Sequence, residues 1–133
     1  MKLKEIKRKT HYIEEFDINV NDYLTYAEIQ VIVNGIIKFN TWSERQTNID
    51  MLVLNFATDI GAEKLQEIGH EALLESGLID EVNNHIVNYT QIYEGIRYTE
   101  SIVKALNDIV KLFPQYQKQI EAVMKDASKH KKR

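Results

Sequence analysis

The sequence has no cysteine, a single proline and only five glycines among 133 residues. Without cysteine, neither a disulfide framework nor a zinc site with thiolate ligands can form, which suits a reducing compartment. The scarcity of proline and glycine argues against a loop-rich or collagen-like chain and favours helices. No segment approaches the roughly eighteen consecutive apolar residues of a membrane span, and the charged first segment lacks the apolar stretch of a signal peptide. We therefore expect one folded domain.

Charge is unevenly distributed along the chain. Residues 1–11 carry five Lys or Arg against one acid, and residues 118–133 carry six against two acids. Residues 12–117 carry six Lys or Arg against seventeen Asp or Glu, a net charge of −11. The overall charge of −3 therefore combines an acidic body with two basic ends. We predict a basic, extended or strand-like N-terminal arm at 1–22, a helical domain at 23–124 and a basic C-terminal tail at 125–133.

Two capping boxes predict where helices begin. Thr25 and Thr41 are each followed three residues later by a glutamate, the spacing at which hydroxyl and carboxylate cap each other's backbone amides. Apolar residues at helical spacing follow each box. They are Ile29, Ile32, Val33, Ile36 and Ile37 in the first helix, and Ile49, Leu52, Val53, Phe56 and Ile60 in the second. We expect the second helix to end at Gly61, because glycine favours a left-handed cap.

The second half of the chain predicts short helical pieces and then one long helix. Gly69 and Gly77 separate the short pieces. The long helix is expected at about 78–113, ending before Pro114, and a last helical piece follows that proline. The apolar face of the long helix broadens after its middle, so the second half of this helix is either wrapped on two sides or buries a different face. The expected fold is an all-α, single-domain helical bundle with this unusually long helix.

Catalytic and metal-binding patterns are scarce. The spacing of Glu67 and His70 matches one half of a di-iron motif, but the second half is missing and Gly69 interrupts the helix. No nucleophile elbow, phosphate-binding loop or dinucleotide-binding motif occurs. Paired acids without an apolar pocket are ordinary surface charge. We predict a protein that is not an enzyme, with no catalytic residue, no metal and no cofactor.

Several residues are candidates for partner contacts. Tyr98 and Arg97 are residue types that anchor interfaces, and Tyr98 lies off the apolar seam that carries Tyr89 and Tyr93. Trp42 stands at a helix entrance, where it can also pack onto the core. The basic tail adds Lys129, Lys131, Lys132 and Arg133. These tail residues either contact DNA without sequence preference, dock on the acidic body of another copy, or complement the C-terminal dipole of the last helix and reach solvent.

The phrases "YAEIQVIVNGIIKFNTWSERQTNIDMLVLNFATDIG", "LLESGLID" and "YEGIRYTES" resemble small helical proteins encoded by phages and prophages of Gram-positive bacteria. The resemblance implies a non-enzymatic phage protein, in the host cytoplasm or the virion, that works through protein–protein contacts. A virion structural or assembly component (connector, tail or capsid accessory protein) that forms a homo-oligomer or binds phage partners is the leading interpretation. The alternatives are an acidic inhibitor of a host nucleic-acid-binding defence protein and a DNA-associated accessory protein acting through its tails.

Overall fold

The computed structural model describes residues 1, 7–112, 114, 118–119, 121–123 and 125. The chain divides into two compact units, Met1–Ile96 and Arg97–Arg133, and the longest helix begins in the first and continues into the second. The elements in order are β1 (Thr10–Ile13), a 3-10 helix (Glu14–Phe16), β2 (Ile18–Asn21), α1 (Tyr26–Ile36), α2 (Trp42–Ala57), α3 (Ala62–Ile68), α4 (His70–Glu75), α5 (Leu78–His85) and α6 (Gln91–Leu112).

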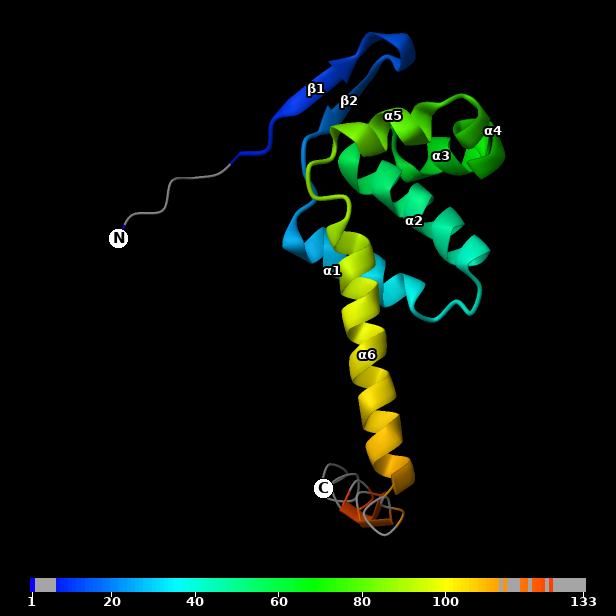
Figure 1. Cartoon of the computed structure of the whole chain (residues 1–133). Coiled ribbons are helices and arrows are strands. Elements are labelled where there is room, and N and C mark those ends of the chain that lie inside the picture. Colours follow the sequence, from blue (N-terminus) through cyan, green and yellow to red (C-terminus); the bar gives the residue numbers. More distant parts are fainter. Residues whose placement is uncertain (2–6, 113, 115–117, 120, 124, 126–133) are drawn as a thin grey trace, which may run out of the picture. The chain divides into compact units, whose positions relative to one another are not determined.

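The N-terminal region contains a β-hairpin, so the prediction of a purely helical fold is wrong and the fold is mostly helical with a small sheet. Strands β1 and β2 pair antiparallel, with Thr10 opposite Asn21 and Ile13 opposite Ile18. Asp17 closes the turn in the left-handed region at φ 52°. Apolar residues alternate with polar ones along β2, which places Ile18 and Val20 in the core. Strand β2 lies against α5 (Figure 1).

Helix α1 confirms the first capping box. The Thr25 hydroxyl accepts a hydrogen bond from the Glu28 amide at 3.2 Å, and the Glu28 carboxylate accepts one from the Thr25 amide at 2.9 Å. Both bonds satisfy backbone donors that the helix leaves without an intrahelical acceptor. The predicted stripe is buried at Ile29, Ile32, Val33 and Ile36.

Helix α2 starts where Thr41 predicts, but it ends earlier than expected. The Thr41 hydroxyl accepts from the Glu44 amide at 3.2 Å. The helix stops at Ala57, because Thr58 is extended and forms an antiparallel bridge with Val20 of the hairpin. Gly61 therefore does not end α2. It stands before α3 at φ 89°, a conformation that favours glycine.

The expected separation of short helices by glycine is confirmed. Gly69 lies between α3 and α4 at φ 85°, and Gly77 lies between α4 and α5 at φ 82°. These positive values are accessible to glycine at low cost, and they allow the chain to change direction within a single residue. As a result α4 packs against both α3 and α5, and all three pack against α2 (Figure 1).

The expected long helix is confirmed as α6, but its predicted bounds of 78–113 are wrong, because the structure contains two helices, α5 and α6, in this range. The Asn88 side chain forms two hydrogen bonds with the backbone of Leu24, accepting from its amide at 2.9 Å and donating to its carbonyl at 2.8 Å. The amide of Val87 donates to the Asp22 carbonyl at 2.8 Å. These contacts hold residues 86–90 out of helical conformation.

A single core lies beneath these elements in the unit Met1–Ile96. Helix α2 contributes Ile49, Val53, Leu54 and Ala57 to it, and it contacts α1, α3, α4 and α5. The first turns of α6 add Ile92 and Ile96, both fully buried. In the part of the chain that the structure describes, no helix has both the length and the apolar character needed to cross a bilayer.

Candidate functional site

The second half of α6 carries a row of exposed apolar side chains, which we call the α6 apolar face. Its six members lie between Tyr98 and Leu112 and are between 42% and 72% exposed. They are Tyr98, Ile102, Val103, Leu106, Ile109 and Leu112. Isolated exposed apolar residues are common, but a contiguous row on one helix is a candidate interaction surface.

The charged side chains of this segment lie on the opposite side of the helix. At about 100° per residue, Arg97, Lys104, Lys111, Glu100 and Asp108 fall within an arc of about 80°. The apolar side chains and Ala105 occupy about half of the circumference. Segment 97–112 is therefore strongly amphipathic, and a partner that covers its apolar face would bury none of these five charges.

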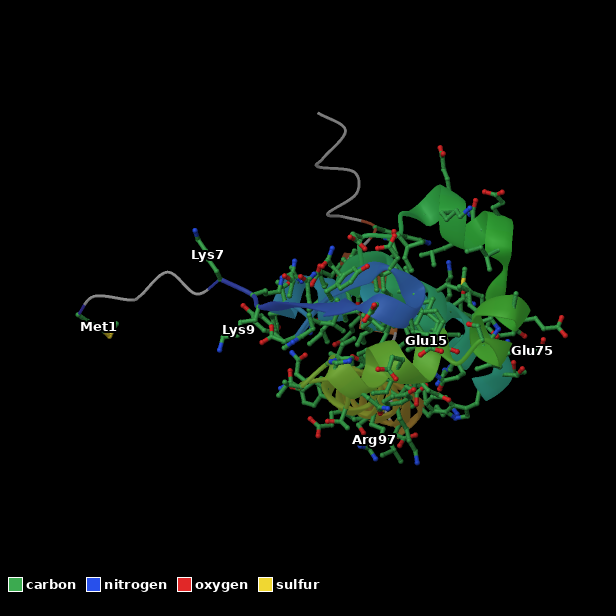
Figure 2. The ribbon with its side chains drawn as sticks, turned by 90° about the horizontal axis from the view of Figure 1, so that it is seen from above. Met1, Lys7, Lys9, Glu15, Glu75 and Arg97 are labelled. Atoms are coloured by element: carbon green, nitrogen blue, oxygen red, sulfur yellow. The ribbon has the colours of Figure 1, made fainter. Side chains whose placement is uncertain are left out.

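The sequence-predicted contact residues fall at different places. Tyr98 is 69% exposed and belongs to the α6 apolar face, whereas the neighbouring Arg97 is exposed on the charged side of the helix (Figure 2). Trp42 is half exposed, stacks on Tyr93 with ring centroids 6.4 Å apart, and lies beneath the Arg45 guanidinium at 5.1 Å. The four basic tail residues lie outside the described part of the chain; they are Lys129, Lys131, Lys132 and Arg133.

The unit Met1–Ile96 contains a polar network around a buried carboxylate. Asp50, on α2, is the one charged residue buried among those described. One of its oxygens accepts a hydrogen bond from the Gln46 amide at 2.9 Å, and the other lies 2.8 Å from His70 Nε2 at the start of α4. Because both oxygens have partners, the carboxylate is accommodated in the core without an unsatisfied acceptor.

Gln46 also joins a closed ring of hydrogen bonds with two tyrosines. The Tyr93 hydroxyl donates to Gln46 Oε1 at 2.8 Å, so the 2.9 Å contact between the two hydroxyls is donated by Tyr89. The ring closes through Gln46 Nε2, which lies 3.5 Å from the Tyr89 oxygen. Burial raises the pKa of the Tyr89 phenol above its ordinary value, and the hydrogen bond with Tyr93 acts in the same direction. The network thereby ties the first turn of α6 to α2.

A polar pocket opens beside this network. Its volume is about 650 Å³, within the range of ligand-binding cavities. It is lined by Gln46 and Asp50 of α2, Leu74 of α4, Ile79, Asp80, Asn83 and Asn84 of α5, and Tyr89. Two of these residues are carboxylates and four offer amide or hydroxyl oxygens, so the lining is rich in hydrogen-bond acceptors.

Glu67 and His70, the residues of the half-motif, do not face one another, and the other histidine–acid pair lies elsewhere. His70 is directed to Asp50 rather than paired with Glu67, which instead lies 3.9 Å from Lys64. His85 lies 3.4 Å from Glu81 and stacks on His11 with ring centroids 5.5 Å apart. Within the described residues, no group of three His, Cys, Asp or Glu is arranged to hold a metal ion.

Sequence reasoning missed the pocket and the network of Asp50. Gln46 and Asp50 are one helical turn apart, a spacing that allows the amide to reach the carboxylate, but their other partners lie on distant segments. The broadening of the apolar stripe after residue 100 was the signal for the α6 apolar face. Comparisons of the chain with protein-family models, with curated proteins and with solved structures find no match.

Proposed function

We propose that this protein is a non-enzymatic assembly protein that associates with further copies of itself through the α6 apolar face. The main supporting observation is the row of six exposed apolar side chains on segment 97–112 of α6, whose five charged residues all lie on the other side of the helix. Burial of a large apolar side chain contributes about 1.5–3 kcal/mol when complete, so covering these half-exposed groups is a substantial driving force.

A second copy fits this face better than an unrelated partner. Val103, Leu106 and Val110 follow a heptad spacing, with β-branched residues at the a positions and leucine at d, a combination typical of self-associating helices. Positively and negatively charged residues alternate along the charged side at spacings of three or four residues, at which they can pair within the helix. The helix therefore needs no oppositely charged partner. An interface between identical faces would contain no charged side chain and would be self-complementary.

The width of the face points to more than two helices. Ile102, Leu106 and Ile109 form a second row beside the heptad row, and both rows share Leu106. A helix with two adjacent apolar rows can contact one neighbour with each row. Cyclic assembly in which each subunit uses one row toward each neighbour gives a closed ring of three or more copies.

The biological setting that we propose is a phage virion or its assembly. Its support is the resemblance to small helical phage proteins, together with a surface suited to repeated contacts between copies. A virion structural or assembly component of this kind would be present in purified particles, or would leave them at a defined assembly step. Mass spectrometry of purified particles and of assembly intermediates tests this setting, and absence from both would contradict it.

A second candidate is the acidic inhibitor of a host nucleic-acid-binding protein. It is favoured by the stretch from Leu65 to Ile96, which holds six Asp or Glu and no Lys or Arg. Such a surface competes with nucleic acid for a basic partner. Displacement of DNA from that partner by the protein, at low salt and independent of the α6 apolar face, would favour this function over assembly.

Light scattering over a range of protein concentrations tests the assembly function. The variant Ile102→Glu/Leu106→Glu places two charges in the α6 apolar face, and we expect it to be monomeric while the unmodified protein forms oligomers. The matched control is Ser101→Glu/Asn107→Glu, which adds the same charges to exposed positions on the polar side of the same helix. The proposal would be contradicted if the unmodified protein stays monomeric, or if the two variants have the same mass in light scattering.

A further inference from the structure

We infer that the pocket beside Asp50 binds the basic segment 125–133 of a second copy. This inference rests on the proposed self-assembly, which brings a second copy within reach. Three independent properties of the pocket support this inference. They are the placement of its carboxylates, its apolar wall, and the lack of any Lys or Arg in the stretch of sequence that supplies most of its lining.

The two carboxylates stand at different depths. Asp50 is 4% exposed and lies at the buried end of the pocket, whereas Asp80 is exposed at its rim. His70, which is not a lining residue, already contacts the buried Asp50 carboxylate. The exposed Asp80 carboxylate therefore supplies most of the negative charge that a ligand can reach. Asn83 and Asn84, whose side-chain amides each carry an acceptor oxygen, also line the pocket. An ammonium or guanidinium group entering the pocket would therefore meet acceptors along its whole path.

The remaining wall suits the stem of a basic side chain. Leu74 and Ile79 line the pocket beside the polar groups. Lysine and arginine bury their methylene stems against apolar surface while the charged end remains with polar partners. A small inorganic cation would leave this apolar wall uncovered, so the lining fits a side chain of a peptide better than an ion.

The surroundings of the pocket attract positive charge. Helices α4 and α5 lie within the stretch from Leu65 to Ile96, which contains no Lys or Arg. The Glu75 carboxylate projects away from α4, as Figure 2 shows, and Glu71 and Glu81 belong to the same two helices. A basic peptide is therefore drawn toward this side before any specific contact forms.

The segment 125–133 is the better of the two basic ends as an occupant. Its sequence, KDASKHKKR, carries five Lys or Arg and one acid. At the other end of the chain, Arg8 already forms an ion pair with Glu28 of α1 at 2.7 Å. Lys9 is fixed in the chain entering the hairpin, where its amide donates to Asp22. Binding of the N-terminal basic segment would require these contacts to break.

Fluorescence anisotropy of a labelled KDASKHKKR peptide tests the inference. The protein used is a full-length variant whose own tail is neutralised, Lys129→Gln/Lys131→Gln/Lys132→Gln/Arg133→Gln, so that the tails of other copies do not compete for the pocket. We expect it to bind the peptide saturably, and to lose about tenfold in affinity when Asp80→Lys is added. The matched control is Glu71→Lys, since both acids lie in the first turn of a short helix and both changes alter the charge by the same amount, but Glu71 does not line the pocket. Asn84→Lys, at an exposed lining position, provides a second pocket variant.

Three results would overturn the inference: no binding of the peptide, equal losses for Asp80→Lys and Glu71→Lys, or equal binding of a peptide with residues 1–9. A peptide in which glutamine replaces every Lys and Arg gives the baseline. The measurement is repeated on Ile102→Glu/Leu106→Glu. We expect this monomeric variant to bind the peptide as well, because the peptide is supplied free. If the protein without these two substitutions binds the peptide but does not self-assemble, the proposed function is faulted; if it self-assembles but does not bind the peptide, only the pocket is faulted.

Discussion

Asn88 and Tyr89 are neighbours in the sequence, yet their side chains serve different parts of the molecule. The Asn88 side chain supplies hydrogen-bond partners for the backbone of Leu24, and it lies in the turn that separates α5 from α6. Tyr89 turns to α2 and completes the hydrogen-bond ring with Tyr93 and Gln46. Two adjacent side chains therefore fix where α6 begins and how its first turn meets the core.

The raised pKa of Tyr89 predicts how stability depends on alkaline pH. The folded protein holds the phenol proton more tightly than the unfolded chain, whose tyrosines ionise at about pH 10. Stability from this group is therefore complete below about pH 10 and falls as the pH rises further. We expect Tyr89→Phe to reduce the slope of unfolding free energy against pH in this alkaline range, measured by denaturant titration at several pH values.

Tyr98→Phe is the matched control for the loss of one phenolic hydroxyl, because Tyr98 is exposed on α6. The comparison uses the slope rather than the absolute stability, since Tyr89→Phe also removes hydrogen bonds that act at every pH. A slope identical to that of the unmodified protein would contradict the assignment of the alkaline loss to Tyr89.

At the scale of the elements, α6 approaches α1 closely at Gly95. A methyl group added at Gly95 would lie 2.9 Å from Val33 Cγ2, a buried atom on a short, stiff side chain. We expect Gly95→Ala to destabilise the protein by about 1–2 kcal/mol, since overpacking costs about 1–3 kcal/mol and the gain in helix propensity returns up to about 1 kcal/mol. Thermal or chemical denaturation measures this change.

Gly35, in the last turn of α1, gives the opposite expectation and serves as the control. The nearest atom to a methyl group at that position is Leu52 Cδ1 at 4.0 Å, an ordinary packing distance. Gly35→Ala should therefore stabilise the protein by up to about 1 kcal/mol through helix propensity alone. Equal effects of the two substitutions would mean that the contact with Val33 is relieved at no cost.

The sequence predicted those elements whose signals are local. The capping box at Thr25 and the glycines at 69 and 77 act within a few residues, and the structure confirms them. The break between α5 and α6 contains neither glycine nor proline, and it depends on Leu24, 64 positions before Asn88. The end of α2 likewise depends on a bridge to Val20. Such distant partners cannot be read from periodicity.

The same distinction applies to the candidate sites. Helical periodicity predicts that Ile102, Leu106 and Ile109 share one face, because one continuous helix presents them. It placed Tyr98 off that face, and it did not predict that the face is exposed. The pocket draws its lining from α2, α4, α5 and the residue Tyr89, so its existence depends on how these segments pack. A row of residues on one helix is therefore predictable from sequence, whereas a cavity assembled from four segments requires the structure.

At the scale of the whole molecule, the two proposed interactions differ in their response to salt. Raising the salt concentration from about 50 mM to about 1 M screens exposed charges, but it does not weaken apolar burial. We expect the oligomer mass from light scattering to persist across this range, while the affinity for the KDASKHKKR peptide falls at least about tenfold. Dissociation of the oligomer at high salt would instead place its contacts at charged residues.

The continuity of α6 has a kinetic consequence for assembly. Starting a helix is its most costly step, whereas extending an existing one is easy. In α6 the first turns are held by the buried side chains of Ile92 and Ile96, so the start is secured by the core of the same molecule. The segment that follows needs only to be extended from this fixed turn. Association would then join helices that are already formed, and encounter and orientation, rather than folding, would set its rate.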